Sequence, residues 1–170
     1  MNDELYSLYD FLISVLRKEI EVYRKVRDCL LMERIILTGT SVDELYESNS
    51  KKETYILKAK MLEEARTKLV GKMIHKLDLD ERNVKLSTLL SYGNDRQETE
   101  LNECQSTLRP LLMDVNELNE KNRVLLNSSI LYVQKSIDFL DHLLSPGAIY
   151  LNTGRLRASG MHGKFVSREG

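Results

Sequence analysis

Apolar residues recur at steps of three and four along the first part of the chain, which places them on one face of a helix. The spacing predicts a helix from about Asp3 to Leu37. A second stripe of the same kind predicts a helix from about Val42 to Leu77, with a kink or a separate short turn at residues 47–52. The two stripes are Leu5, Leu8, Leu12, Leu16, Ile20, Tyr23, Val26 and Leu30, then Leu45, Ile56, Ala59, Leu62, Leu69, Met73 and Leu77.

Helix-ending and helix-starting residues lie between these stripes. Gly39 is expected to end the first helix in the left-handed conformation. Ser41 and Glu44 have the spacing of a capping box, in which each side chain reaches the other's backbone amide. Residues 78–95 are expected to form a connector, with a short helix around residues 86–90. Asn94 or Asp95 is expected to cap the helix that follows.

The third predicted helix, from about Asp95 to Leu144, carries the longest regular pattern. Its apolar seam follows a heptad repeat without a slip, which is typical of coiled-coil packing. Pro110 removes one helical hydrogen bond and is expected to bend the helix. Asn122 lies on the seam, where a buried amide would fix the register of the helices. The seam consists of Leu101, Cys104, Leu108, Leu111, Val115, Leu118, Asn122, Leu125, Ser129, Tyr132, Ser136, Phe139 and Leu143.

From residue 126 onward a second apolar seam runs beside the first. Two adjacent seams make a face that is too broad for a single helical partner. We expect this half of the helix to pack against both other helices. The alternative is an exposed groove for a binding partner. The second seam consists of Leu126, Ile130, Val133, Ile137, Leu140 and Leu144.

Together the patterns predict an all-α protein, an elongated antiparallel three-helix bundle with coiled-coil packing over residues 1–145. Residues 146–170 contain five of the eight glycines and show no sustained period. This tail is expected to be flexible, although it contains apolar residues that would suit a partner. It has four basic residues and one acidic residue, whereas the whole chain has a net charge of −1.

The composition of the chain gives little indication of a catalytic, metal or phosphate site. The three histidines lie far apart, the two cysteines are isolated, and no spacing suits a metal. No glycine-rich loop has the strand–loop–helix context of a phosphate site. We therefore expect no enzyme activity, no metal and no cofactor. Basic and acidic residues alternate along the helices, which argues against nucleic-acid binding.

The expected location is the cytoplasm. The start of the chain, Met1 to Glu4, lacks the positive charge of a signal peptide. The uncharged, apolar-leaning run from Val124 to Gln134 is too short to cross a bilayer, so no membrane insertion is expected. Cys29 and Cys104 are then expected to be reduced and buried.

Residues 117–133, which read ELNEKNRVLLNSSILYV, resemble the signature of the FlgN family of bacterial flagellar export chaperones. The similarity extends upstream to residues 41–45, 51–53 and 62–66, and downstream to residues 150–154. The positions that match the family pattern are Asn119, Asn122, Leu125, Leu126, Ser129 and Tyr132.

The resemblance implies a cytosolic chaperone without catalysis. Family members bind the C-terminal helical segments of hook–filament junction (hook-associated) proteins, prevent premature assembly, and present them to the flagellar type III export apparatus. Cargo binding is associated with the C-terminal region, which suggests a set of contacts on the third helix and the tail. That set is Ile130, Val133, Ile137, Tyr150, Leu151, Leu156, Met161, Phe165 and Val166.

One departure from this picture concerns the tail, where Gly154, Gly160 and Gly163 disfavour a continuous amphipathic helix. The tail could bind as a short helix or as extended segments, or the helix face could contribute more. A structural coiled-coil protein that self-associates into a homo-oligomer through its heptad seams is the alternative function.

Overall fold

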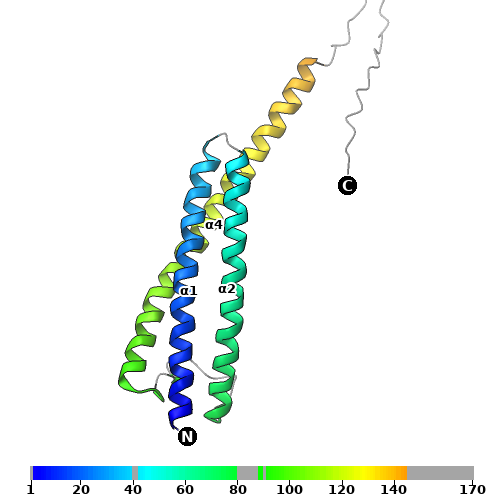
Figure 1. Cartoon of the computed structure of the whole chain (residues 1–170). Coiled ribbons are helices and arrows are strands. Elements are labelled where there is room, and N and C mark those ends of the chain that lie inside the picture. Colours follow the sequence, from blue (N-terminus) through cyan, green and yellow to red (C-terminus); the bar gives the residue numbers. More distant parts are fainter. Residues whose placement is uncertain (1, 40–41, 80–87, 90, 145–170) are drawn as a thin grey trace, which may run out of the picture. The chain divides into compact units, whose positions relative to one another are not determined.

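Three long helices make up the chain in a computed structural model, which describes residues 2–39, 42–79, 88–89 and 91–144. Helix α1 spans Asn2–Leu37, α2 spans Val42–Lys76 and α4 spans Asp95–Leu144 (Figure 1). The predicted helices therefore agree with the structure to within one residue at each end. No strand occurs in the described ranges, so the all-α, three-helix class is confirmed.

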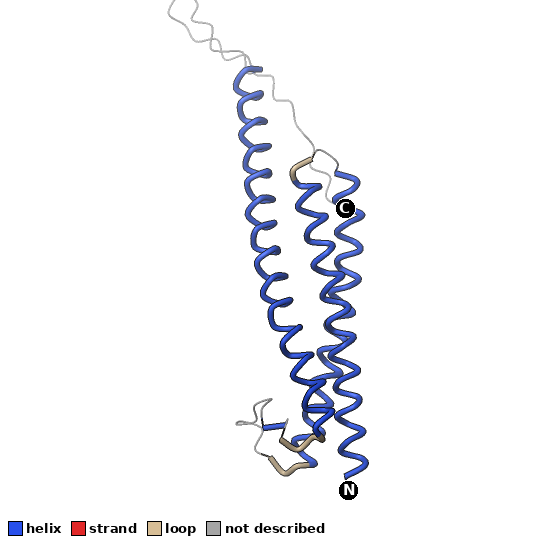
Figure 2. The backbone as a smooth tube through the Cα atoms, turned by 90° about the vertical axis from the view of Figure 1, so that its left-hand side faces the viewer, coloured by secondary structure: helices blue, strands red, loops and turns tan. Residues whose placement is uncertain are grey.

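The chain divides into two compact units, Met1–Leu126 and Asn127–Gly170. In the first unit α1 and α2 run side by side in opposite directions, and the first turns of α4 run antiparallel to α2 (Figures 1 and 2). In the second unit the described residues, 127–144, are the last turns of α4. The predicted boundary between residues 145 and 146 stays a prediction, because residues 145–170 lie outside the described part.

The main core of the first unit is made by all three helices. Tyr9 of α1, Met73 of α2 and Leu101 of α4 have no exposed surface. Val26, Leu30 and Leu118 form a second, smaller cluster. All of these positions except Tyr9 belong to the apolar stripes of the sequence, so the pattern identifies much of the buried face of each helix. The main cluster consists of Tyr9, Leu12, Ile13, Leu16, Ile20, Met73, Ile74, Leu89, Leu101, Cys104 and Leu111.

The N-terminus of α4 is held by a capping box on Asn94, one of the two residues expected to cap this helix. The backbone amide of Gln97 donates to Asn94 Oδ1 at 2.9 Å, and the Asn94 amide donates to Gln97 Oε1 at 3.4 Å. The Gln97 side chain is buried, and its Nε2 also donates to the carbonyl oxygen of Tyr6 and to Asp10 Oδ1. The cap thus also fixes the start of α4 against α1.

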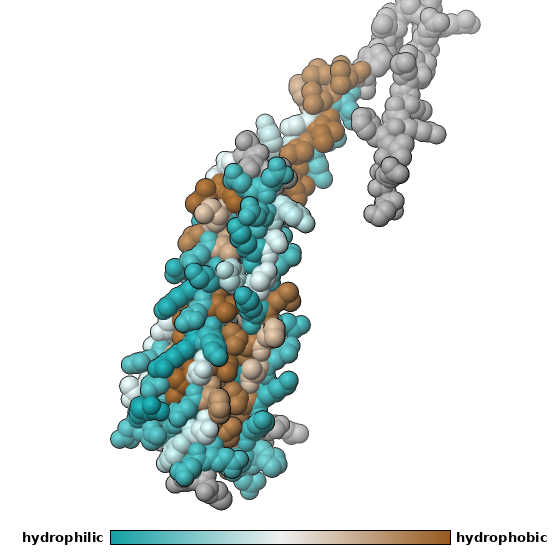
Figure 3. All heavy atoms as spheres, viewed as in Figure 1, coloured by the Kyte–Doolittle hydropathy of each residue, from teal (hydrophilic) through white to brown (hydrophobic). Residues whose placement is uncertain are grey.

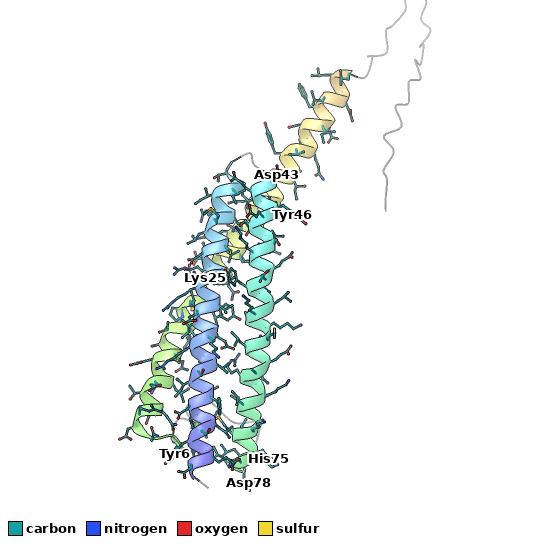
Figure 4. The ribbon with its side chains drawn as sticks, viewed as in Figure 1. Tyr6, Lys25, Asp43, Tyr46, His75 and Asp78 are labelled. Atoms are coloured by element: carbon teal, nitrogen blue, oxygen red, sulfur yellow. The ribbon has the colours of Figure 1, made fainter. Side chains whose placement is uncertain are left out.

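The ends of α1 and α2 differ from the prediction. Gly39 does not adopt the left-handed conformation, so that prediction is wrong; α1 is closed by backbone hydrogen bonds from Thr38 and Gly39 to the carbonyls three residues earlier. The left-handed residue is Asp78, with φ of 53°, after α2 (Figure 4). The amides of Asp78 and Leu79 donate to His75 and Ile74, which is a Schellman end. Asp tolerates this conformation better than most residues.

The sequence suggested an interruption at two places, residues 47–52 of α2 and Pro110 of α4. Helix α2 is continuous through residues 47–52, so the separate short turn, one of two alternatives expected there, is wrong, and the kink stays a prediction. The ion pair of Lys51 with Glu47, one turn apart, supports the helix at this point. Pro110 lies inside α4, and the helix continues on both sides of it, so the bend expected there stays a prediction. Ser41 of the predicted capping box lies outside the described residues, as does most of the predicted short helix at residues 86–90.

We expect the Tyr9→Phe substitution to lower the free energy of unfolding by about 1–3 kcal/mol. The Tyr9 hydroxyl donates to the buried carbonyl oxygen of Leu89, which would lose its partner. Urea unfolding at neutral pH measures the change. Tyr6→Phe is the matched control, because the Tyr6 hydroxyl makes no hydrogen bond to the described part of the chain. An equal loss in both variants would contradict the assignment.

Burial raises the pKa of Tyr9 to about 12, helped by the neighbouring Tyr92. An unfolded tyrosine ionises near pH 10, so the folded state binds the Tyr9 proton more tightly. The stability that this difference provides is complete below pH 10 and is lost as the pH rises to 12. The stability gap between the wild type and Tyr9→Phe should therefore narrow over that range.

Candidate partner-binding surfaces

The seam of α4 changes from buried to exposed along its length. In the first unit the seam residues Leu101, Leu111 and Leu118 are buried. From residue 127 to residue 144 every described side chain is exposed except that of Ser136, which is half-buried. The exposed fractions of the large apolar side chains here range from 48% to 78%. They belong to Ile130, Leu131, Tyr132, Val133, Ile137, Phe139, Leu140, Leu143 and Leu144.

The prediction that this half of α4 packs against both other helices is therefore wrong. This half of α4 is exposed because the three helices differ in length. Helices α1 and α2 have 36 and 35 residues, whereas α4 has 50. At 1.5 Å per residue, these correspond to about 54, 53 and 75 Å. Helices of such unequal length cannot cover the apolar stripe of the longest one over its whole extent.

The exposed segment, residues 127–144, is strongly amphipathic. Helical spacing places Ile130, Val133 and Ile137 on one stripe and Tyr132 and Phe139 on a neighbouring stripe, with Ser129 and Ser136 between them. The opposite face contains Gln134, Asp138 and Asp141. In Figure 3 the last turns of α4 appear as brown, hydrophobic spheres. We call the two stripes together the apolar face of residues 127–144.

Of the nine contact residues that the resemblance suggests, three lie in the described part of the chain and six lie outside it. Ile130, Val133 and Ile137 are brought together on the apolar face, with exposed fractions of 48%, 54% and 53%. Tyr132 and Phe139 are missing from that set, although both lie on the heptad seam; they line a shallow hollow with Lys135, Ser136 and Leu140. The tail residues Tyr150, Leu151, Leu156, Met161, Phe165 and Val166 lie outside the described residues.

A second apolar surface, which the sequence did not reveal, lies within the first unit. It is a groove of about 670 Å³ between α2 and α4, which we call the α2/α4 groove. Leu12 and Leu16 of α1 line it together with Val70 of α2 and with Leu101, Leu108 and Leu112 of α4. A smaller hollow shares Asn116 with it and continues to Asn119. The signal for it in the sequence is weak, because Leu112 lies just beside the regular seam.

Near the end of the first unit a polar network joins the three helices. Asn122 of α4 is buried, and its Nδ2 donates to the Leu30 carbonyl oxygen at 2.7 Å and to Glu33 Oε2 at 3.0 Å. Lys52 of α2 donates to the other oxygen of Glu33 at 2.7 Å. The network allows one axial alignment of the three helices, because a shifted helix would leave these groups buried and unpaired. It fits the register role predicted for Asn122.

A second buried charge lies beside the α2/α4 groove. The Glu19 carboxylate is 1% exposed, and Arg66 Nε donates to its two oxygens at 3.0 and 3.2 Å. Burial raises the pKa of Glu19, and the hydrogen bond and charge of Arg66 oppose this increase. The pair joins α1 to α2, and Arg66 also lines the groove.

These surfaces offer contact area rather than reactive groups. Burial raises the pKa of the Cys29 and Cys104 thiols, which favours the unreactive protonated form, and neither cysteine forms a disulfide. Among the described residues no cluster of three or more His, Cys, Asp or Glu side chains could hold a metal. No helix within these ranges is long and apolar enough to span a membrane.

An exposed apolar face on a helix favours a protein partner that covers it. A family model described as FlgN protein matches residues 1–158, and the chain belongs to the FlgN family. Comparisons with curated proteins and with solved structures gave no match. FlgN proteins are flagellar export chaperones and not enzymes, which gives this chain a role in flagellum biogenesis as a chaperone of export substrates.

We expect Asn122→Ala to lower the free energy of unfolding by about 1–3 kcal/mol, because the Leu30 carbonyl and Glu33 lose a buried donor. Thermal or urea unfolding measures the effect. Asn119→Ala, three residues earlier on the exposed side of α4, is the control and should change stability by less than about 0.5 kcal/mol. Equal effects would show that the network does not contribute.

Proposed function

We propose that this protein is a cytoplasmic chaperone that binds the C-terminal helical segments of hook–filament junction proteins. It keeps these segments from assembling before export and presents its cargo to the flagellar type III export apparatus. The observation that supports the proposal is the apolar face of residues 127–144, which is exposed although its side chains are large and apolar.

The physical basis is the match between two amphipathic helices. An exposed apolar helix face of this size is costly in water and favours a partner that covers it. The end of a junction protein that forms a helix in the assembled filament has an apolar stripe of its own. Packing one stripe on the other buries both, while Gln134, Asp138 and Asp141 stay in water.

The tail is the second part of the proposed cargo site. Tyr150, Leu151, Leu156, Met161, Phe165 and Val166 supply apolar side chains that would add contact area beside the helix face. Gly154, Gly160 and Gly163 disfavour one long helix, so we propose that the tail binds in short segments. Its excess of basic residues favours cargo with an acidic surface.

A structural coiled-coil protein is the competing function. Its support is the same exposed face, because a heptad pattern also suits self-association. The two functions differ in what covers the face: a junction-protein segment in the first, other copies of this chain as the permanent state in the second. Binding to a purified cargo segment therefore separates them.

The test is a calorimetric titration with the purified C-terminal segments of the junction proteins from the same organism. Three proteins are compared: the full chain, a chain ending at Ser145, and the variant Val133→Asp/Ile137→Asp. We expect micromolar or tighter binding by the full chain. The double substitution should weaken it by about 30-fold or more, because charge replaces two central apolar contacts.

The matched control is Asn127→Asp/Gln134→Asp, which adds the same charge on the opposite face of the same turns and should bind like the full chain. Loss of binding on truncation would place much of the affinity in the tail. Absence of binding by the full chain, with stable self-association in its place, would contradict the chaperone function and favour the structural alternative.

A further inference from the structure

Two uncovered apolar surfaces lie within the described part of the chain, and they belong to different units. One is the α2/α4 groove of the first unit, and the other is the apolar face of residues 127–144 in the second. Of these two surfaces, the proposed function uses the face. The groove has no role in it, although apolar walls of this extent favour an occupant.

The groove has the length and lining of a helix-binding site. With the hollow that shares Asn116, it extends along α4 from Leu101 to Asn119, or about 27 Å at 1.5 Å per residue. Its walls are mainly Leu and Val side chains. Its charged lining is predominantly basic, with one acidic residue: Lys52, Lys60, Arg66, Arg109 and Glu63. Within the described part Arg109 takes part in no ion pair, whereas Arg66 pairs with Glu19 and Glu63.

The segment 127–144 matches this groove in length, polarity and charge. Its 18 residues also span about 27 Å as a helix. One half of its circumference is apolar, and the other half contains Asp138 and Asp141 against the single basic residue Lys135. An apolar stripe bordered by carboxylates suits an apolar groove bordered by basic side chains.

We propose that the α2/α4 groove binds residues 127–144 of a second copy of this chain. The groove and the segment cannot meet within one copy, because Leu101–Asn119 and residues 127–144 are stretches of α4, a single unbroken helix, and two such stretches cannot lie side by side. A second copy removes this restriction. It covers an apolar groove and an apolar helix face in one contact.

The contact is reciprocal. Each copy has one groove and one segment, so two copies can each bind the other's segment, which is the self-complementary arrangement of a closed dimer.

The test is a charge exchange followed by sedimentation velocity of the full-length chain. Arg109→Glu reverses a charge of the groove, and Asp138→Lys/Asp141→Lys reverses the charge of the segment. All three side chains are exposed, so the helices should form as in the wild type, which circular dichroism checks. We expect a dimer for the wild type and at least about a tenfold weaker association for each variant alone, because like charges then meet in both contacts.

The mixture of the two variants distinguishes this contact from any other. In the mixed dimer one groove keeps Arg109 opposite the native carboxylates of Asp138 and Asp141. The other groove places the introduced glutamate opposite the two introduced lysines, so association should return to the wild-type level. Arg24→Glu, an exposed arginine of α1 outside the groove, is the control and should not weaken the dimer.

Three results would overturn the proposal: a monomeric wild type at all concentrations, a dimer that neither variant weakens, or weakened variants that the mixture does not restore. The measurement contains no cargo. Its failure would therefore leave the binding of junction-protein segments, which the titration above tests, unaffected.

Discussion

The structure depends on one constraint, that an amphipathic helix must cover its apolar stripe, and α4 has a longer stripe than its partners can cover. Helices α1 and α2, of 36 and 35 residues, provide the core for the first part of α4. The last 18 residues of the 50-residue helix keep the same heptad pattern with exposed side chains. In a single copy the stripe is thus buried in one part and exposed in the other, and the change between the two takes place near Asn122.

Polar contacts determine where along α4 the buried part ends and the exposed part begins. A seam of leucines alone tolerates sliding by a heptad, because each heptad offers similar packing. The Asn122–Glu33–Lys52 network at one end of the first unit and the Asn94–Gln97 cap at the other both pair specific groups. They fix which residues of α4 are buried, and so which are available to a partner. Specificity of alignment here comes from few polar groups, and stability comes from the apolar core.

The sequence predicted those features that depend on local spacing. Helix bounds, the Asn94 cap and the burial of Asn122 follow from residues within a few turns of one another. The exposure of residues 127–144 could not be predicted, because it depends on the lengths of two other helices. The α2/α4 groove was missed for a similar reason: it arises from how far two helices are apart, which heptad positions do not specify. The left-handed Asp78 was missed because the pattern favours glycine at such ends.

The central claim is that the apolar face of residues 127–144 is the surface on which cargo packs, and methyl-resolved NMR tests it most directly. A junction-protein C-terminal segment would be added to the chain labelled at its Ile, Leu and Val methyl groups. The account predicts shifts of Ile130, Val133 and Ile137, with Ile13 and Ile20 of the core unchanged. Shifts confined to α1 and α2, with the methyl groups of residues 127–144 unaffected by saturating cargo, would contradict it.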